Sequence, residues 1–407
     1  MLPRTLLPFS SKILVVPMLV LPLGKITGQT HDHSHPHPSD HHHGVVAGSQ
    51  TILTIEDVLA MEHNRAVSQD SKKVRKSGRS GDGDFQFEVH VTSKSLPKKV
   101  FEPNPFDGRK RKILNCAHGG FAYDHRKGKG EVYWFLQGGG IIRVHKDRSK
   151  IEMVKTDPKM LKFNMHNATF FEHKGEAMIA WPANGGASVF ITDVDGKLLR
   201  TIGRPTMLPY SKGAAYAPTD TAYLDGMLWV TDGYASKFVM SYDLDAEKWT
   251  GTIFGGRSKK IETGKFGVNH GITIRKGLIY IADRFFARIH SYKPESKEGT
   301  MFPLPTGCKP CDFEFFVSDG KLYGVAGGLM KPAGSKDKGA SVYIVDMATM
   351  KVVSTVKPKD DLGLGTFTHL HDAFATMDDG VVTLFCQAWN GGDFAVLRQV
   401  PKTKKAK

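Results

Sequence analysis

The chain has 407 residues, of which 40% are hydrophobic and 24% are charged, so its composition is that of a globular protein with a large core. Its formal net charge of +15 would suit an acidic partner such as nucleic acid, but the excess of Lys and Arg gathers in short runs at 72–76, 109–112 and 402–407. These runs fall in expected linkers or the tail, and no aromatic-plus-basic module accompanies them, so nucleic-acid binding is not predicted.

Residues 1–30 have the pattern of a secretory signal peptide. Arg4 and Lys12 precede an apolar run over 13–23, and small residues follow the run at Gly24 and Gly28. The run is too short for an ordinary membrane span, and an uncleaved anchor is the alternative. We therefore expect a secreted or periplasmic protein without stable membrane insertion.

The next segments contain few core-forming residues. Seven of the thirteen residues from 31 to 43 are histidines, so 31–50 is expected to be a disordered segment that captures metal weakly or is merely solvated. A loosely helical pattern over 51–66 and a basic, Gly- and Ser-rich stretch over 72–84 predict that 51–112 forms a short helix and a linker. Residues 401–407 are expected to be a basic tail.

Short apolar strands separated by turns with Gly or Asp recur between residues 113 and 400. A period near 50 residues, about four strands per unit and six units predict an all-β protein, a six-bladed β-propeller. A solenoid is the competing repeat fold, but four strands per unit favour blades. The residues that open the first strand of each unit are His118, His166, Asp220, His270, Asp312 and His371.

Three of these opening residues suggest a metal site. His166, His270 and His371 are 104 and 101 residues apart, which is two blades per step and places them about 120° apart around a six-bladed ring. Three neutral imidazoles on the axis leave one tetrahedral position open, as in catalytic zinc sites. Iron, manganese or cobalt could take the same ligands, and the alternative is that each histidine is only a hydrogen-bonded strand end.

The motifs between these histidines resemble those of peptidyl-α-hydroxyglycine α-amidating lyase, a six-bladed propeller of the NHL-repeat type. The resemblance covers about residues 113–400 and rests on Pro-Thr-Asp at 218–220, Asp-Gly-Tyr at 232–234, Ala-Asp-Arg at 282–284 and the histidine spacing. It implies cleavage of an α-hydroxyglycine-type amide, from a small-molecule or peptide substrate, into an amide and glyoxylate.

The resemblance also implies two metal ions. The family's three zinc histidines match His166, His270 and His371, here without the prolines that precede them in the family. The family's structural calcium is held partly by groups that match the Asp372 carboxylate and the Ala168 carbonyl.

The resemblance assigns catalytic roles with one clear departure. Tyr234 would accept the proton of the substrate hydroxyl, and Arg284 beside it would supply positive charge. The family's catalytic arginine in the first blade matches Gln137, a neutral amide that cannot supply this charge. His118 is a further axial histidine that the family lacks. The alternative function is a non-catalytic NHL propeller that binds a protein, peptide or glycan and holds only structural metal.

The four cysteines are Cys116, Cys308, Cys311 and Cys386. In an exported protein disulfides are the default, so Cys308 and Cys311 are expected to form a local bridge, with a redox pair or metal ligands as alternatives. A Cys116–Cys386 bridge is also conceivable, because the first and last blades are neighbours in a closed ring. The oligomeric state does not follow from the sequence.

Overall fold

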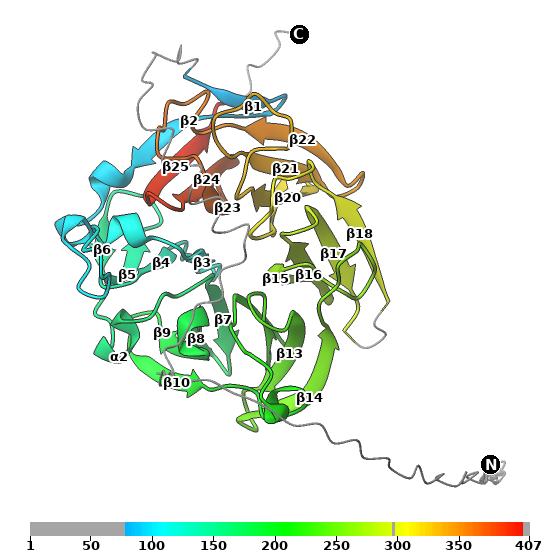
Figure 1. Cartoon of the computed structure of the whole chain (residues 1–407). Helices are drawn as coiled ribbons and strands as arrows, with labels where there is room; N and C mark the ends of the chain where they lie inside the picture. The colour runs from blue at the N-terminus through cyan, green and yellow to red at the C-terminus, as the bar shows by residue number, and fades with distance from the viewer. Residues whose placement is uncertain (1–77, 295–297, 402–407) are drawn as a thin grey trace, which may run out of the picture. The chain divides into compact units, whose positions relative to one another are not determined.

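The computed structural model describes residues 78–294 and 298–401, which form six antiparallel β-sheets arranged in a ring (Figure 1). The predicted six-bladed all-β propeller is thus confirmed. The expected signal peptide, His-rich segment and helix over 51–66 lie outside the described residues, as does nearly all of the basic tail. No helix in the described ranges is long and apolar enough to cross a membrane.

The blades follow one another along the chain, and within each blade the strands are ordered from the axis outward. Blade 1 contains β3 (Phe121–Tyr123), β4 (Val132–Leu136), β5 (Gly140–Val144) and β6 (Ile151–Met153), and blade 2 contains β7 (Thr169–His173), β8 (Glu176–Ala183), β9 (Ser188–Asp193) and β10 (Leu198–Ile202). Blade 3 contains β11 (Asp220–Leu224), β12 (Met227–Thr231), β13 (Phe238–Asp243) and β14 (Lys248–Gly255), and blade 4 contains β15 (Asn269–Arg275), β16 (Leu278–Asp283), β17 (Arg288–Tyr292) and β18 (Gly299–Pro303). Blade 5 contains β19 (Glu314–Ser318), β20 (Lys321–Gly327), β21 (Val342–Asp346) and β22 (Lys351–Val356), and blade 6 contains β23 (Leu370–Asp378), β24 (Val381–Ala388), β25 (Asp393–Gln399), β2 (Phe85–Thr92) and β1 (Ser80–Asp82).

The short helical segments lie in the connections. The helix α2 (Pro158–Leu161) joins blades 1 and 2, and the Asp157 carboxylate caps it by accepting a hydrogen bond from the Lys159 amide at 2.9 Å. The 3₁₀ turns are η1 (Ser93–Ser95), η2 (Lys98–Phe101), η3 (Leu114–Cys116), η4 (Asn184–Gly186) and η5 (Tyr210–Lys212).

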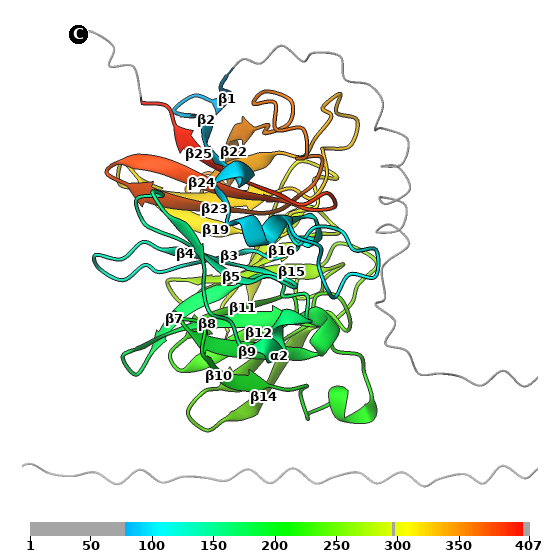
Figure 2. The same ribbon diagram turned by 90° about the vertical axis from the view of Figure 1, so that its left-hand side faces the viewer.

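Blade 6 closes the ring with strands from both ends of the described chain. In both views β1 and β2 lie beside β25 and β22, and β2 pairs antiparallel with β25 in a register that places Phe87 opposite Gln399 (Figures 1 and 2). The linker expected over 51–112 is therefore wrong for residues 80–92, which are strands of the propeller. The apolar–polar alternation that starts at Phe85 carries the strand signal, but it directly follows a Gly-rich basic stretch.

The closing strand β2 is anchored in the core by Phe87, and the strength of this anchor should be measurable. Phe87 is fully buried in one cluster with residues of blades 5 and 6. Phe87→Ala should lower the free energy of unfolding by about 3–5 kcal/mol, because it leaves a cavity in a packed core. Urea unfolding measures this change. Glu88→Ala, at the exposed neighbouring position, is the matched control and should change stability by less than about 0.5 kcal/mol; equal effects of the two substitutions would contradict the anchoring role.

The hydrophobic core lies between neighbouring blades. Trp134 of β4 and Phe385 of β24 belong to one buried cluster, which joins blades 1 and 6. Trp181 of β8 and Tyr133 of β4 belong to another, which joins blades 2 and 1. Similar clusters fill the remaining interfaces. Because blades hold one another in place in this way, the ends of their innermost strands are fixed around the axis.

Hydrogen bonds between blades reinforce this arrangement where the innermost strands begin. The Gly120 amide of blade 1 donates to the His166 carbonyl of blade 2 at 3.4 Å, and the Asn167 amide donates to the Thr219 carbonyl of blade 3 at 3.2 Å. The residues that open the innermost strands are thereby brought to one end of the axis.

Candidate metal centre

The three histidines predicted to share a metal ion converge on the axis. His166, His270 and His371 are each 0% exposed. Their ring centroids are 4.5 Å apart for His166 and His270, 4.6 Å for His166 and His371, and 5.0 Å for His270 and His371. Blades 2, 4 and 6 therefore deliver their imidazoles to one point, as the spacing of the repeat predicts.

Backbone carbonyls orient two of the three imidazoles. His166 Nδ1 lies 2.7 Å from the Thr219 carbonyl, and His270 Nδ1 lies 2.6 Å from the Cys311 carbonyl. Because a carbonyl oxygen only accepts, each Nδ1 must carry the hydrogen, and the lone pair of each neutral ring is on Nε2, which faces the axis. This tautomer, fixed by a backbone acceptor, is the form in which histidine binds metal.

His371 is the member of the group with the most unusual environment. It is fully buried, and neither of its ring nitrogens has a hydrogen-bond partner within residues 78–294 and 298–401. An unsatisfied buried nitrogen costs about 1–3 kcal/mol, and a bound cation would relieve this cost. The donor set therefore fits a metal ion.

All three imidazoles are held in the neutral state that a metal requires. Burial is the main cause that lowers the pKa of His166, His270 and His371 well below the usual range. Positive charge nearby adds to it, since Arg284 lowers all three pKa values and His118 does the same. Neutral rings keep a lone pair available at neutral pH.

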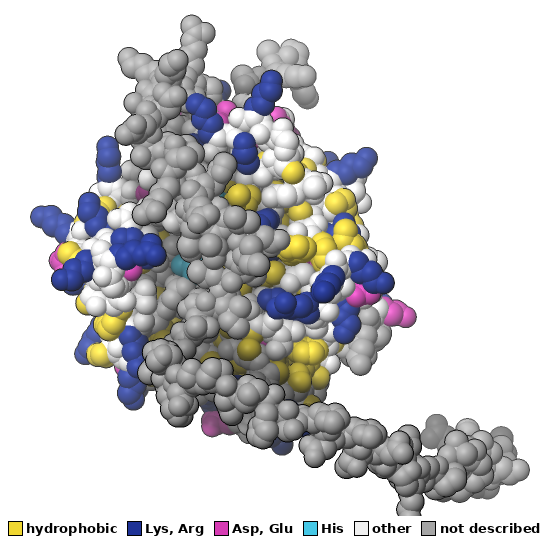
Figure 3. All heavy atoms as spheres, viewed as in Figure 1, with side chains coloured by type: hydrophobic (Ala, Val, Ile, Leu, Met, Phe, Trp, Pro, Cys, Tyr) yellow, Lys and Arg dark blue, Asp and Glu magenta, His cyan; other side chains and the backbone are white. Residues whose placement is uncertain are grey.

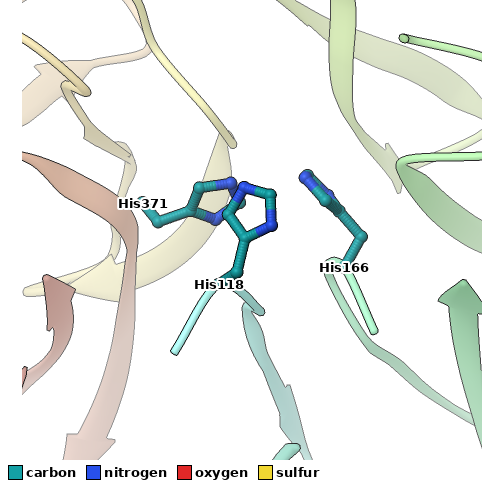
Figure 4. A group of neighbouring side chains, drawn as sticks. All are labelled: His118, His166 and His371. Carbon is teal, nitrogen blue, oxygen red and sulfur yellow. The ribbon is translucent and has the colours of Figure 1, made fainter. Parts of the chain in front are cut away.

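Two further side chains join this group. His118 of blade 1 points toward His166 and His371 (Figure 4), and the ligand atoms of these three residues lie within 4.8 Å of one another. A second set with the same limit contains His270, Cys311 and His371. The predicted triad is thus divided between two sets that share His371. Cys311 as an axial residue was missed, although its position directly before Asp312 repeats that of His371 before Asp372.

The predicted proton acceptor and the predicted positive charge also reach the histidines. Tyr234 Oη lies 3.1 Å from His166 Nε2 and 3.0 Å from His270 Nε2, and Arg284 Nη1 donates to the same oxygen at 3.0 Å. The Arg284 guanidinium also lies over the Tyr234 ring, 5.0 Å from its centroid. Because arginine only donates, the phenol oxygen accepts this bond and has one proton left to share with the imidazoles.

The Asp-Gly-Tyr motif shapes the loop that presents Tyr234. The Asp232 carboxylate accepts hydrogen bonds from the Tyr210 hydroxyl and the Ala217 amide, each at 2.8 Å. A Cβ atom at Gly233 would collide with Thr219 Oγ1 and lie 2.5 Å from the Asn269 carbonyl oxygen, so only glycine fits between blades 3 and 4 there. The aspartate and the glycine of the motif therefore position the tyrosine.

Gln137 lies in the turn after β4. Its side-chain amide donates to the Lys162 carbonyl at 2.8 Å, directly after α2. The side-chain amide of Gln137 is thus bonded to the backbone of the connection between blades 1 and 2. A role of Gln137 in catalysis stays a prediction.

Oxygen atoms gather one residue beyond the histidines, where the resemblance predicts calcium. Asp372 Oδ1 and Asn167 Oδ1 are buried and have no hydrogen-bond partner in the part of the chain that the structure describes. A Cβ atom at Gly120 would lie 2.7 Å from Asp372 Oδ2 and 2.8 Å from Asn167 Oδ1, so glycine leaves these oxygens room to approach each other. Ala168, the other predicted ligand residue, directly follows Asn167 and is buried. Hard oxygen donors of this kind fit Ca²⁺.

Three buried carboxyl groups, those of Asp220, Asp312 and Asp372, lie close to one another near these oxygen atoms. Burial, and after it the proximity of Asp312, raises the pKa of Asp220 and of Asp372 well above the usual range. Burial raises the pKa of Asp312 to about 7. A cation bound here would lower these pKa values and stabilise the ionised carboxylates.

The expected Cys308–Cys311 bridge is not formed in the structure, where all four cysteines are free. Lys309 between the two has a left-handed φ of 53°, and the two thiols have different surroundings. Cys308 packs in the cluster between blades 4 and 5, whereas Cys311 Sγ lies among the axial residues. Burial raises the pKa of both thiols to about 12. Cys116 and Cys386 are not bridged either.

No protein-family model matches the chain, and no curated protein matches it. Among solved structures, a chain of a crystallised nidogen/laminin complex is 15% identical over 69% of this chain and 92% of that chain, with a TM-score of 0.43. A member of the DUF4221 family from Bacteroides vulgatus is 10% identical over 79% of this chain and 98% of that chain, with a TM-score of 0.44. At these scores neither likeness carries an inference about function.

Proposed function

We propose that this propeller is a metal-dependent lyase that cleaves the C–N bond of an α-hydroxyglycine-type amide and releases an amide and glyoxylate. One observation carries the proposal: the Tyr234 hydroxyl contacts the Nε2 atoms of His166 and His270 and also the Arg284 guanidinium. A proton acceptor, a fixed positive charge and neutral metal-type ligands therefore meet in one group, in which the histidines are buried and Tyr234 is partly exposed.

The chain's own residues would perform the following steps. Tyr234, ionised to the phenolate, accepts the proton of the substrate hydroxyl, and Arg284 holds this oxygen in place and stabilises its negative charge before the transfer. As the hydroxyl-bearing carbon becomes the aldehyde of glyoxylate, the electrons of the C–N bond leave with the amide nitrogen. That nitrogen then takes the proton back from Tyr234, so that the products are a neutral amide and an aldehyde and Tyr234 returns to the phenolate.

Zinc, or another divalent transition metal, is the ion that His166, His270 and His371 would hold. It would supply Lewis acidity toward the substrate oxygen. Calcium would be held by the Asp372 carboxylate, with the Ala168 carbonyl as a further ligand, and would tie blades 2 and 6 together. An exported, calcium-containing compartment, as the expected signal peptide implies, would suit both ions.

Glyoxylate release from a peptide that ends in α-hydroxyglycine tests the proposal. We expect the zinc-loaded full chain to release glyoxylate and amidated peptide in equal amounts, and the chelated chain to be inactive. A protein that contains metal but releases no glyoxylate would refute the lyase assignment.

Replacement of Gln137 tests whether the missing charge limits the reaction. If Gln137 occupies the position of the family arginine, Gln137→Arg should raise kcat/KM toward the factor of about 10²–10³ that one stabilising donor contributes. Gln137→Met, which also breaks the bond to Lys162 but adds no charge, is the control and should not raise the rate. Steady-state glyoxylate assays on the three proteins measure the effect. A decrease in both variants would instead assign Gln137 a role in shaping the rim.

The neutral Gln137, bonded to the backbone at Lys162, also favours a second candidate function. In this alternative the propeller binds a protein, peptide or glycan at the same mouth without turnover, and any metal is structural. The glyoxylate assay distinguishes the two functions, because in the binding alternative a hydroxyglycine peptide would bind without release of glyoxylate.

A further inference from the structure

Cys311 occupies a position on the axis that matches that of the histidines. Its amide donates to the Gly327 carbonyl at 3.1 Å, and its own carbonyl accepts the Nδ1 hydrogen of His270 at 2.6 Å. The residue is 0% exposed, and its Sγ lies 3.9 Å from the Leu370 carbonyl, next to His371. Two backbone bonds thus fix Cys311 between blades 4 and 6, with its sulfur turned toward the axis.

The sulfur completes a set of metal donors. The ligand atoms of His270, Cys311 and His371 all lie within 4.8 Å of one another. Bonds of about 2.0–2.1 Å to nitrogen and 2.3 Å to sulfur, at tetrahedral angles, require separations of about 3.3–3.7 Å between donor atoms, so each pair must approach by at most about 1.5 Å to bind one ion. His371 supplies an independent indication, since its two buried ring nitrogens have no hydrogen-bond partner among the residues described.

The surroundings favour a coordinated thiolate over a free one. The Arg284 guanidinium reaches the Cys311 thiol as well as the Tyr234 hydroxyl. A bound metal ion deprotonates a coordinating thiol outright, and the nearby guanidinium would stabilise the resulting negative charge.

We propose that the Cys311 thiolate is a ligand of the axial metal ion, together with His270 and His371. This inference rests on the proposed metal centre and puts a soft sulfur donor in the place of the His166 imidazole, so that three protein ligands still leave one tetrahedral position open for the substrate oxygen. A nitrogen-and-sulfur set selects thiophilic ions such as Zn²⁺, Co²⁺ or Cu⁺ over Mn²⁺, Mg²⁺ and Ca²⁺. The axis would then hold a sulfur–imidazole site for a soft metal and, one residue farther along, an oxygen site for a hard one.

Cobalt spectroscopy of the full chain tests this inference. Co²⁺ added to the chelated protein should give the intense near-ultraviolet band of thiolate-to-cobalt charge transfer as well as the weak visible bands of tetrahedral cobalt. Cys311→Ser should lose the first and keep the second, with Zn²⁺ affinity reduced at least about tenfold, since even residues behind the ligands contribute 10–100-fold. Cys308→Ser, which changes a buried cysteine of the same loop outside the axis, should keep both bands.

Each other outcome has a definite meaning. Visible bands without a charge-transfer band in the wild-type protein would overturn the inference and leave an all-nitrogen site. A band that survives in Cys311→Ser would overturn it too, as would a wild-type protein that binds no Co²⁺. The lyase assay is independent: glyoxylate release without a thiolate band would refute only the sulfur ligand, and a thiolate band without glyoxylate would refute only the lyase.

Discussion

Tyr234→Phe is expected to lower glyoxylate release by a factor of about 10²–10⁴, the range that a positioned proton acceptor contributes, while the metal content stays unchanged. The substitution removes only the hydroxyl that contacts His166 Nε2, His270 Nε2 and Arg284. The imidazoles keep their backbone acceptors, so their lone pairs still face the axis. Turnover measurements combined with metal analysis of the same samples give the result.

A matched control shows that the effect depends on this hydroxyl. Tyr223→Phe removes a hydroxyl that bonds His173 and the Gly226 amide, near the end of β11 that lies away from the axial histidines, and it should leave turnover unchanged. If Tyr234→Phe lost metal together with activity, the hydroxyl would be needed for metal binding, and its role as proton acceptor would not be supported.

His371→Ala is expected to have the largest effect on metal binding, because His371 belongs to both sets of axial donors. Loss of a shared ligand should reduce Zn²⁺ affinity by more than about 100-fold and abolish turnover. Stability without metal should fall less than in Phe87→Ala, since the cost of the cavity left by the ring is partly offset by the removal of two buried nitrogens that have no hydrogen-bond partner among the described residues. Equilibrium dialysis with Zn²⁺ and thermal unfolding with chelator measure the two quantities.

His173→Ala is the control for that variant. His173 ends β7, the innermost strand of blade 2, and bonds Tyr223 and Asp245 at the end of the strand away from the axial histidines. Its replacement should leave Zn²⁺ binding and turnover unchanged. A chain that keeps full Zn²⁺ affinity after His371→Ala would show that the axial histidines hold no shared ion.

The propeller was predictable from the sequence because each blade is a local unit. Strand, turn and strand follow one another within about 50 residues, so the repeat shows the blade number without knowledge of contacts. The spacing of His166, His270 and His371 then places them on alternate blades, and the structure brings them together. The closing strand around Phe87 was missed because its partner, β25, lies at the other end of the chain, and periodicity does not report distant pairing.

The composition of the axial group was harder to predict because it depends on contacts between blades. Cys311 and His118 become neighbours of His371 only when the ring closes, and a Cys-x-x-Cys pattern alone favours a bridge. The left-handed backbone at Lys309 and the packing of Cys308 between blades place the two thiols in different surroundings. Neither feature can be predicted from the spacing of the cysteines. The contact of Tyr234 with Arg284 was expected from the resemblance. The close packing at Gly233, where only glycine fits, shapes the loop that presents Tyr234.

The ring closure in blade 6 also governs the order in which the molecule can be assembled. Blades 1 to 5 contain only neighbouring segments and can fold as the chain leaves the ribosome, but Phe87 must wait until Gln399, more than 300 residues later in the sequence, has been synthesised. Pairings of such high contact order form slowly, because the entropy of closing a very long loop opposes them. We therefore expect a form in which blade 6 contains β23, β24 and β25 but still lacks β1 and β2 to precede the native state, with the exposed edge of β25 as the surface that chaperones must protect until β2 docks.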